Sequence, residues 1–283
     1  NFKNNKFKKT SANLVLFADE KFKTNDLKKY ISNSELSYIT DLLKTCDLSK
    51  NLFVFELSSK KKIVLISIKK NIKNSDIENL GAEFYGRVNY GKNSEYLINL
   101  NSILGNHEDF IGYFLHGLKL KSYEFNKYKS KKDTRIITIN LFGNKNRPSS
   151  NDLLKFKALE EGTFFARDLV SEPGNVLHPD EYAKRLRLLK KFGLKVNIYD
   201  QKKLKKLGMN ALLGVGMGSI RGSYLVTLEW NGAKNNSKPC AFIGKGVTFD
   251  TGGYSLKPAR FMEDMTYDMA GSAAVVGLMK NLA

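Results

Sequence analysis

The order of apolar and polar residues predicts that strands and helices alternate along this chain of 283 residues. Short runs of β-branched and aromatic residues have the composition of strands at 12–18, 52–57, 62–68 and 134–141. Apolar residues recur every three or four positions, as on one face of a helix, at 25–45, 75–87 and 110–122. Residues 1–145 are therefore expected to form a small N-terminal α/β domain, in which we find no catalytic signature.

A loop rich in turn-forming and charged residues, 143–151, is the best candidate for a domain boundary. Residues 146–170 are then expected to form a linker loop and a helix, and residues 171–283 a second α/β domain. Because its apolar strands are separated by helices, we expect a mixed sheet covered by helices, with functional loops at the carboxyl ends of strands. The predicted helices are 180–191 (with Asp180 as N-cap), 201–207 and 270–282, and the predicted strands are 194–199, 224–230 and 239–244.

Composition indicates a soluble globular protein, with 42% hydrophobic and 27% charged residues. No apolar run approaches the roughly 20 residues that a membrane helix needs, so we expect a cytoplasmic protein without a membrane partner. Cys46 and Cys240 lie far apart, which argues against a disulfide scaffold, and Cys240 is expected to be buried. The three histidines lack metal-ligand spacing and are expected to be structural.

The net charge of +19 raises a second hypothesis, a basic DNA-binding or assembly protein. Lysine supplies most of this excess, since the chain has only eight arginines. Aromatic residues do not interleave with the basic runs as base-stacking platforms would require. Charge alone therefore favours nonspecific nucleic-acid binding at most, with the lysines scattered at 60–62, 69–70, 129–132 and 202–206.

The candidate chemistry is concentrated in residues 244–271, GKGVTFDTGGYSLKPARFMEDMTYDMAG. Asp250 and Asp268 are hard oxygen ligands suited to Mg, Mn or Zn. Lys245 could ligate a metal only after losing its proton, which a nearby dication in a low-dielectric pocket promotes. Lys257 would stay charged and stabilise an oxyanion. The structural alternative is that lysines beside glycine-rich turns are common and that Asp268 caps the last helix.

The segment GKGVTFDTGGYSLKP, followed by MTYDMAGSAAV, closely resembles the signature of the leucyl (cytosol) aminopeptidase family. The resemblance extends upstream through ARDLV at 166–170, EPGNVL at 172–177 and LGVGMG at 213–218, and more weakly to about residue 110. It implies a small N-terminal α/β domain followed by a catalytic α/β domain, of which 171–283 would be the N-terminal part. It also implies peptide substrates and a homo-hexamer.

The resemblance assigns a role to each residue of the set. Lys245 and Asp268 would ligate one of two divalent metal ions, Mn or Zn, and Asp250 would bridge both. Lys257 would be the catalytic lysine that polarises the scissile carbonyl. Met265 would line the pocket for the first side chain of the substrate, and Asp268 would also receive its free α-amino group. The implied activity is release of N-terminal, leucine-like residues from peptides.

The sequence departs from the family pattern after Asp268. The family supplies a further aspartate, a bridging glutamate and a bicarbonate-holding arginine from a later segment resembling NTDAEGR, and this chain has no such segment. We therefore expect a C-terminally truncated, inactive piece of an active enzyme, holding one weakly bound metal at most. A pseudoenzyme truncated in the organism itself is the third hypothesis.

Overall fold

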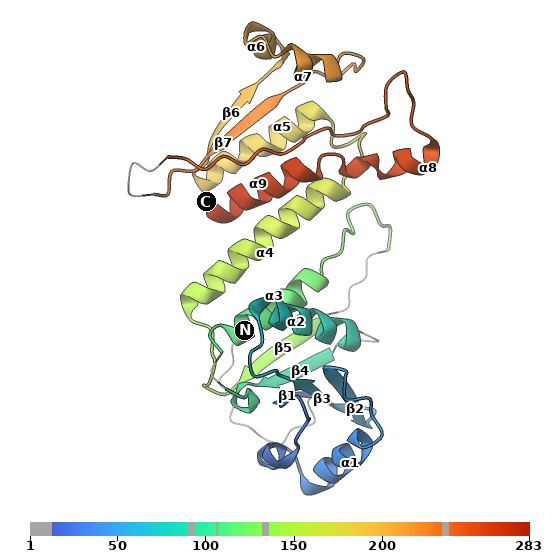
Figure 1. The fold of residues 1–283 in the computed structure, drawn as a ribbon, viewed down its shortest axis with the longest axis vertical. Helices are drawn as coiled ribbons and strands as arrows, with labels where there is room; N and C mark the ends of the chain where they lie inside the picture. The colour runs from blue at the N-terminus through green and yellow to red at the C-terminus, as the bar shows by residue number, and fades with distance from the viewer. Residues whose placement is uncertain (1–12, 90–93, 106, 132–135, 234–237) are drawn as a thin grey trace. The chain divides into compact units, whose positions relative to one another are not determined.

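The computed structural model describes residues 13–89, 94–105, 107–131, 136–233 and 238–283. The chain forms two compact units, residues 1–156 and 157–283 (Figure 1). Their boundary falls inside helix α4, Ser150–Ser171. Each unit is described by itself below.

The first unit is built on a five-stranded mixed sheet with the strand order β2-β3-β1-β4-β5. Neighbouring strands are parallel except for β2, which runs antiparallel to β3. The starts predicted at residues 12 and 134 for the first and last strands lie outside the described residues. The strand β4 was not predicted from the sequence. The strands are β1 Asn13–Ala18, β2 Leu52–Ser58, β3 Lys61–Ser67, β4 Ser94–Asn99 and β5 Ile137–Phe142.

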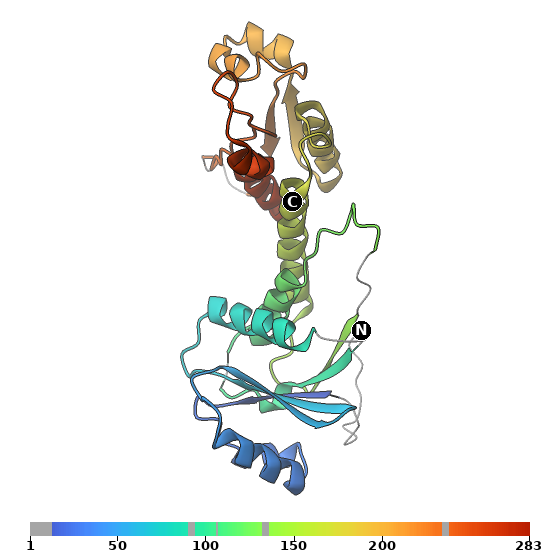
Figure 2. The same ribbon diagram turned by 90° about the vertical axis from the view of Figure 1, so that its right-hand side faces the viewer.

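Helices cover both faces of this sheet (Figure 2). Side chains of β1 alternate between them, because successive residues of a strand point to opposite faces. Leu14 and Leu16 pack in the core under α1, whereas Val15 and Phe17 pack in the core with α2 and α3. The predicted α/β class is therefore confirmed. The mixed, helix-covered sheet that was expected of the second domain is found in the first unit, whereas the described part of the second unit has a two-stranded antiparallel sheet. The helices are α1 Asn33–Leu43, α2 Asn74–Val88 and α3 Phe110–Lys121, with short 3₁₀ helices at Asn25–Lys29 and Leu100–Ser102.

The single helix predicted over 25–45 is two elements, and the reason is local. Ser32 accepts a hydrogen bond from the Glu35 amide, while the Glu35 carboxylate accepts one from the Ser32 amide. This reciprocal capping box starts a new helix at Asn33 rather than continuing the 3₁₀ turn before it.

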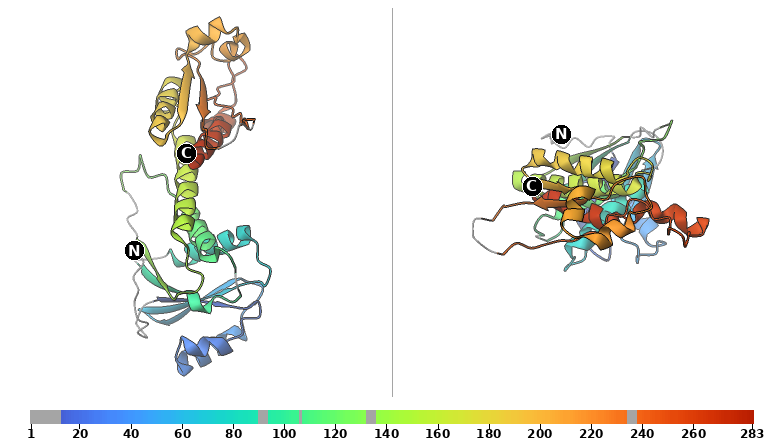
Figure 3. Two further views of the ribbon diagram at one scale, coloured as in Figure 1. Left: turned by 90° about the vertical axis from the view of Figure 1, so that its left-hand side faces the viewer. Right: turned by 90° about the horizontal axis from the view of Figure 1, so that it is seen from above.

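The second unit contains the antiparallel pair β6 Lys195–Tyr199 and β7 Leu225–Glu229. Its strands alternate rather than being apolar throughout. Val196 and Leu228 face each other and pack in one core with helices α5 and α9, which lie beside the pair (Figure 3). The other elements are α5 Pro179–Arg187, α6 Gln201–Lys206, α7 Asn210–Val215, α8 Ala259–Met262 and α9 Ala270–Leu282, with 3₁₀ helices at Leu188–Phe192 and Glu263–Tyr267.

Two predictions for residues 239–244 are wrong. Residues 239–244 do not form a strand, and Cys240 is exposed rather than buried. A strand needs a hydrogen-bonding neighbour, and the described residues supply none beside this segment. Its apolar side chains are consequently in water, with Ile243 95% exposed. Within the described ranges, no helix combines the length and apolar character needed to cross a membrane.

Candidate active site

The segment that contains Lys245 lies directly against the start of α9. The Ser272 amide donates a hydrogen bond to the Lys245 carbonyl oxygen at 2.9 Å. A Cβ atom built on Gly244 would lie 2.5 Å from the Gly271 carbonyl oxygen, closer than real Cβ atoms come. Glycine at 244 therefore lets the two backbones touch, which brings Lys245 near the residue just before the helix.

Lys245 and Asp268 form the first of two ion pairs. The Lys245 Nζ atom donates to Asp268 Oδ1 at 2.7 Å, with the lysine mostly exposed and the aspartate mostly buried. The hydrogen bond to the Asp268 carboxylate raises the pKa of Lys245, because the carboxylate stabilises the ammonium form. These residues lie 23 positions apart in sequence, and the structure brings their side chains into contact.

Lys257 and Asp250 form the second pair. The Lys257 Nζ atom donates to Asp250 Oδ2 at 2.8 Å, and the Gly252 amide donates to Asp250 Oδ1 at 2.9 Å. The hydrogen bond from Lys257, followed by that from Gly252, lowers the pKa of Asp250. Gly252 has φ +90, and a Cβ atom there would lie 2.4 Å from the Ser255 carbonyl oxygen, so the turn between the partners requires glycine.

The two pairs share one electrostatic environment. The charge of Asp250 also contributes to raising the pKa of Lys245, and Lys245 contributes to lowering the pKa of Asp250. Met265 belongs to the same group, because its Sδ atom lies 3.2 Å from Lys257 Nζ. All five residues predicted for the site are therefore brought together within the second unit.

A model of the cytosol aminopeptidase family, catalytic domain, matches residues 164–283, which contain all five of these residues. A probable cytosol aminopeptidase of Wolbachia pipientis wMel is 39% identical over 242 residues, 82% of this chain and 46% of the relative. Another, from Chelativorans sp. (strain BNC1), is 49% identical over 174 residues, 59% of this chain and 35% of the relative. The chain belongs to the cytosol aminopeptidase family.

Solved structures extend the likeness in fold to nearly the whole chain. A cytosol aminopeptidase from Coxiella burnetii has a TM-score of 0.71 at 22% identity, covering 97% of this chain and 56% of that one. The bottromycin maturation enzyme BotP, solved in complex with Mn, has a TM-score of 0.70 at 22% identity, covering 96% and 56%. At this identity the likeness establishes the fold alone. The chain spans less than half the length of the two aminopeptidase relatives named above.

The donor set of this chain fits a divalent metal ion. Asp268 Oδ2 is buried and accepts no hydrogen bond in the described part of the chain, so an acceptor with a free lone pair remains beside Lys245. An unpaired buried carboxylate oxygen is costly unless a cation compensates it. Among the described residues no three His, Cys, Asp or Glu side chains gather into a metal-binding group, which leaves as donors two carboxylates and the Lys245 amine, which can ligate a metal only after the ammonium loses its proton.

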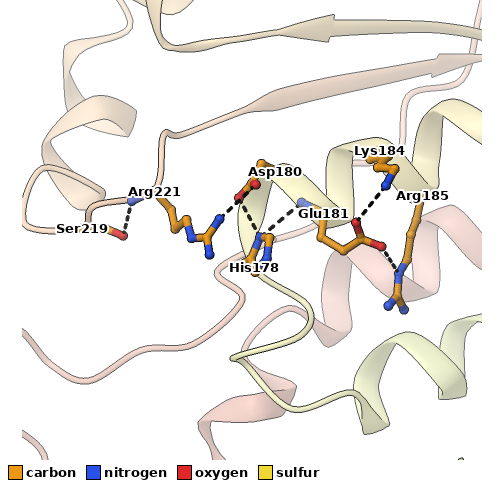
Figure 4. Close-up of polar contacts among 7 residues, drawn as sticks. All are labelled: His178, Asp180, Glu181, Lys184, Arg185, Ser219 and Arg221. Atoms are coloured by element: carbon orange, nitrogen blue, oxygen red, sulfur yellow. Dashed lines mark hydrogen bonds and ion pairs between the residues drawn. The ribbon is translucent and has the colours of Figure 1, made fainter.

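The start of α5 differs from the prediction (Figure 4). Pro179 is the first helical residue and His178 is the N-cap, so the prediction of Asp180 as N-cap is wrong. The reason is that proline favours the first helical position, where its missing amide proton costs no hydrogen bond. Asp180 then lies in the first turn, where a negative charge interacts favourably with the helix dipole.

The His178 side chain joins a polar network rather than the candidate site. Its Nδ1 atom lies 2.6 Å from Asp180 Oδ1 and 3.4 Å from the Glu181 amide nitrogen. One nitrogen cannot donate and accept at once, and a carboxylate only accepts, so Nδ1 donates to Asp180. Arg221 donates to Asp180 Oδ2 at 3.2 Å, and the network therefore ties the loop holding Arg221 to α5 (Figure 4).

Two residues behind the site were given no role by the sequence. Ser272 donates its amide to Lys245, and its hydroxyl group lies 3.0 Å from the hydroxyl of Tyr182 on α5. Ser272 belongs to the MTYDMAGSAAV motif, whereas Tyr182, 90 positions before it, lies in no motif. A single sequence offers no signal that would pair them.

Proposed function

We propose that this chain carries part of the active site of a metal-dependent aminopeptidase that releases N-terminal, leucine-like residues from peptides. The observation that carries the proposal is the gathering of Lys245, Asp268, Lys257 and Asp250 into two neighbouring ion pairs within the family-matched region. Both carboxylates are metal donors by type, and both lysines are placed where their charges act on the carboxylates. The family supports a peptidase, and the residue roles below are our proposal.

The charged side chains are proposed to have the following tasks. Lys245, after losing its proton, and Asp268 would hold one divalent metal ion, and Asp250 would contribute a carboxylate to this ion and to a second one. Two such ions, Mn or Zn, would supply a water molecule of lowered pKa for attack on the peptide carbonyl. Lys257 donates a hydrogen bond to the carbonyl oxygen and stabilises the negative charge that develops on it. The ammonium of Lys257 is already oriented in this structure by Asp250 and by the Met265 sulfur atom.

Substrate selection is proposed to rest on Asp268 and Met265. A carboxylate at Asp268 attracts the free α-amino group of a peptide, which favours N-terminal residues over internal ones. Met265 is unbranched and adaptable, and its contact with Lys257 supports assigning it to the pocket for the first side chain of the substrate. We assign no residue of this chain to bicarbonate.

The described donors are sufficient for one metal ion. Three protein ligands and a water molecule complete a four-coordinate catalytic site, and Lys245, Asp250 and Asp268 are three donors. A second ion would share only Asp250 among them. We therefore propose that the chain by itself binds one ion weakly and hydrolyses peptides poorly. We also propose a cytoplasmic location, from the names of its relatives, and a homo-hexamer in the full-length protein.

Hydrolysis of leucine p-nitroanilide with added Mn²⁺ or Zn²⁺ tests the proposal. Hydrolysis is measured for two proteins. The first is this chain, and the second, the joined chain, is a fusion of this chain with the part of the Wolbachia relative to which this chain has no counterpart. We expect activity in the joined chain, and a loss of at least ~100-fold in kcat when Lys257→Gln removes the charge beside the carbonyl. The exposed Lys202→Gln is the matched control and should retain full activity. Inactivity of the joined chain with both metals would contradict the proposal, as would full activity of Lys257→Gln.

A further inference from the structure

The distance between Lys245 and Asp268 depends on where the first turn of α9 lies. The Ser272 amide on that turn donates to the Lys245 carbonyl at 2.9 Å, and Asp268 stands two residues before the helix begins. The contact at Gly244 leaves no space between the two backbones. A shift of the first turn of α9 would therefore move Asp268 relative to Lys245.

The hydroxyl group of Ser272 has a fixed hydrogen-bonding direction. Its Oγ atom donates to the Met269 carbonyl oxygen at 2.8 Å and lies 3.0 Å from the Tyr182 hydroxyl oxygen. A serine hydroxyl has a single proton, and that proton is used on Met269. Ser272 must therefore accept a hydrogen bond from Tyr182, and the phenol of Tyr182 is the donor.

The side chain of Tyr182 is buried in the core of the second unit. It is 6% exposed, and its ring packs in the same core as Leu186 of α5 and Met269 and Ala273 at the start of α9. A buried phenol hydroxyl costs free energy unless it finds a partner, and Ser272 is that partner. The ring therefore holds its hydroxyl group in place, and the hydroxyl holds the first turn of α9.

We propose that Tyr182 is a positioning residue for the metal-binding pair. Its hydroxyl group, acting through Ser272, fixes the first turn of α9 against Lys245 and so sets the separation of Lys245 and Asp268. Tyr182 touches neither substrate nor metal in this scheme. The inference rests on the proposed function, because it assigns Lys245 and Asp268 to a metal ion.

The first test compares Mn²⁺ affinity by isothermal titration calorimetry in the full chain and in Tyr182→Phe, which removes one oxygen atom. We expect binding about 10-fold weaker, the size seen when groups that orient metal ligands are lost. Ser272→Ala should weaken binding similarly, and the double variant should be no worse than either single variant, because both remove the same hydrogen bond. Leu186→Val, in the same helix and core, is the control for general loss of stability and should leave the affinity unchanged.

A second readout does not depend on metal. Hydrogen exchange measured by NMR should rise about 10-fold at the Ser272 amide in Tyr182→Phe, because the hydrogen bond to Lys245 opens more often. The amides of β6 and β7 should exchange at unchanged rates. Unchanged exchange at Ser272 would overturn the inference, as would an equal loss of Mn²⁺ affinity in Leu186→Val. A third outcome separates the two proposals. If neither the unchanged chain nor any variant binds Mn²⁺, but exchange at the Ser272 amide still rises in Tyr182→Phe, the proposed function is wrong and the positioning of α9 by Tyr182 stands.

Discussion

Strand β1 of the first unit and the site segment 240–258 of the second are held in place by different forces. β1 has five of its six residues buried, between two neighbouring strands and under helices on both faces. In the site segment, Ile243 and Tyr254 are almost fully exposed. Backbone contacts, two ion pairs and a glycine turn hold this segment in place. Apolar burial therefore positions the first region, and polar contacts position the second.

The largest difference between the two regions should be seen when one aromatic ring is removed from each. Phe114 is fully buried and lies against the rings of Phe17, Phe84 and Phe110, so Phe114→Ala should lower the free energy of unfolding by about 3–5 kcal/mol. Tyr254→Ala, in the site segment, should change it by less than about 0.5 kcal/mol. Urea denaturation measures both variants, and equal losses would show that the comparison is mistaken.

A smaller effect is expected where polar contacts are themselves buried. Glu172, at the end of α4, is 2% exposed in its side chain and accepts from Arg185 on α5 at 3.0 Å. Glu172→Gln should destabilise the second unit by about 2 kcal/mol, because Arg185 loses its buried carboxylate partner and keeps its ion pair with Glu181. The exposed pair of Lys195 and Glu229 is the control, and Glu229→Gln should cost less than about 1 kcal/mol. Thermal unfolding followed by circular dichroism would rank them, and a larger loss in Glu229→Gln would contradict the account.

Most strands and helices of the first unit, β4 excepted, could be predicted from sequence because their side chains follow the periods of two and 3.6. Residues 239–244 show where this reasoning fails. Their composition is that of a buried strand, but the outcome depends on a neighbouring strand that no local pattern specifies. The site residues were found differently, from their chemistry and from a resemblance, and the structure then showed ion pairs between residues 23 and 7 positions apart. Tyr182 was missed because a tyrosine at an apolar helical position is indistinguishable from ordinary core.

Tyr182 also gives the second unit a dependence on alkaline pH. Burial raises the pKa of Tyr182 to about 12, from an ordinary value of 10.0. Because the folded state raises this pKa, the protonated form of Tyr182 contributes to the free energy of unfolding. That contribution is fully present below pH 10 and is lost as the pH rises through about 12. Between pH 9 and pH 12, the free energy of unfolding should therefore fall by about 2 kcal/mol more in the unchanged chain than in Tyr182→Phe. Urea denaturation at both pH values measures this difference, and identical pH profiles would contradict it.

We propose that the polar contacts around Lys245, Asp250 and Asp268 prearrange these side chains for a divalent metal. Titration of the full chain with Mn²⁺ by isothermal calorimetry tests it most directly. The account predicts one ion per chain, and a loss of affinity of ~100-fold or more in Asp268→Asn. The exposed Asp264→Asn, four residues away, should bind as the unchanged chain does. Equal Mn²⁺ affinity in Asp268→Asn and the unchanged chain would contradict the claim.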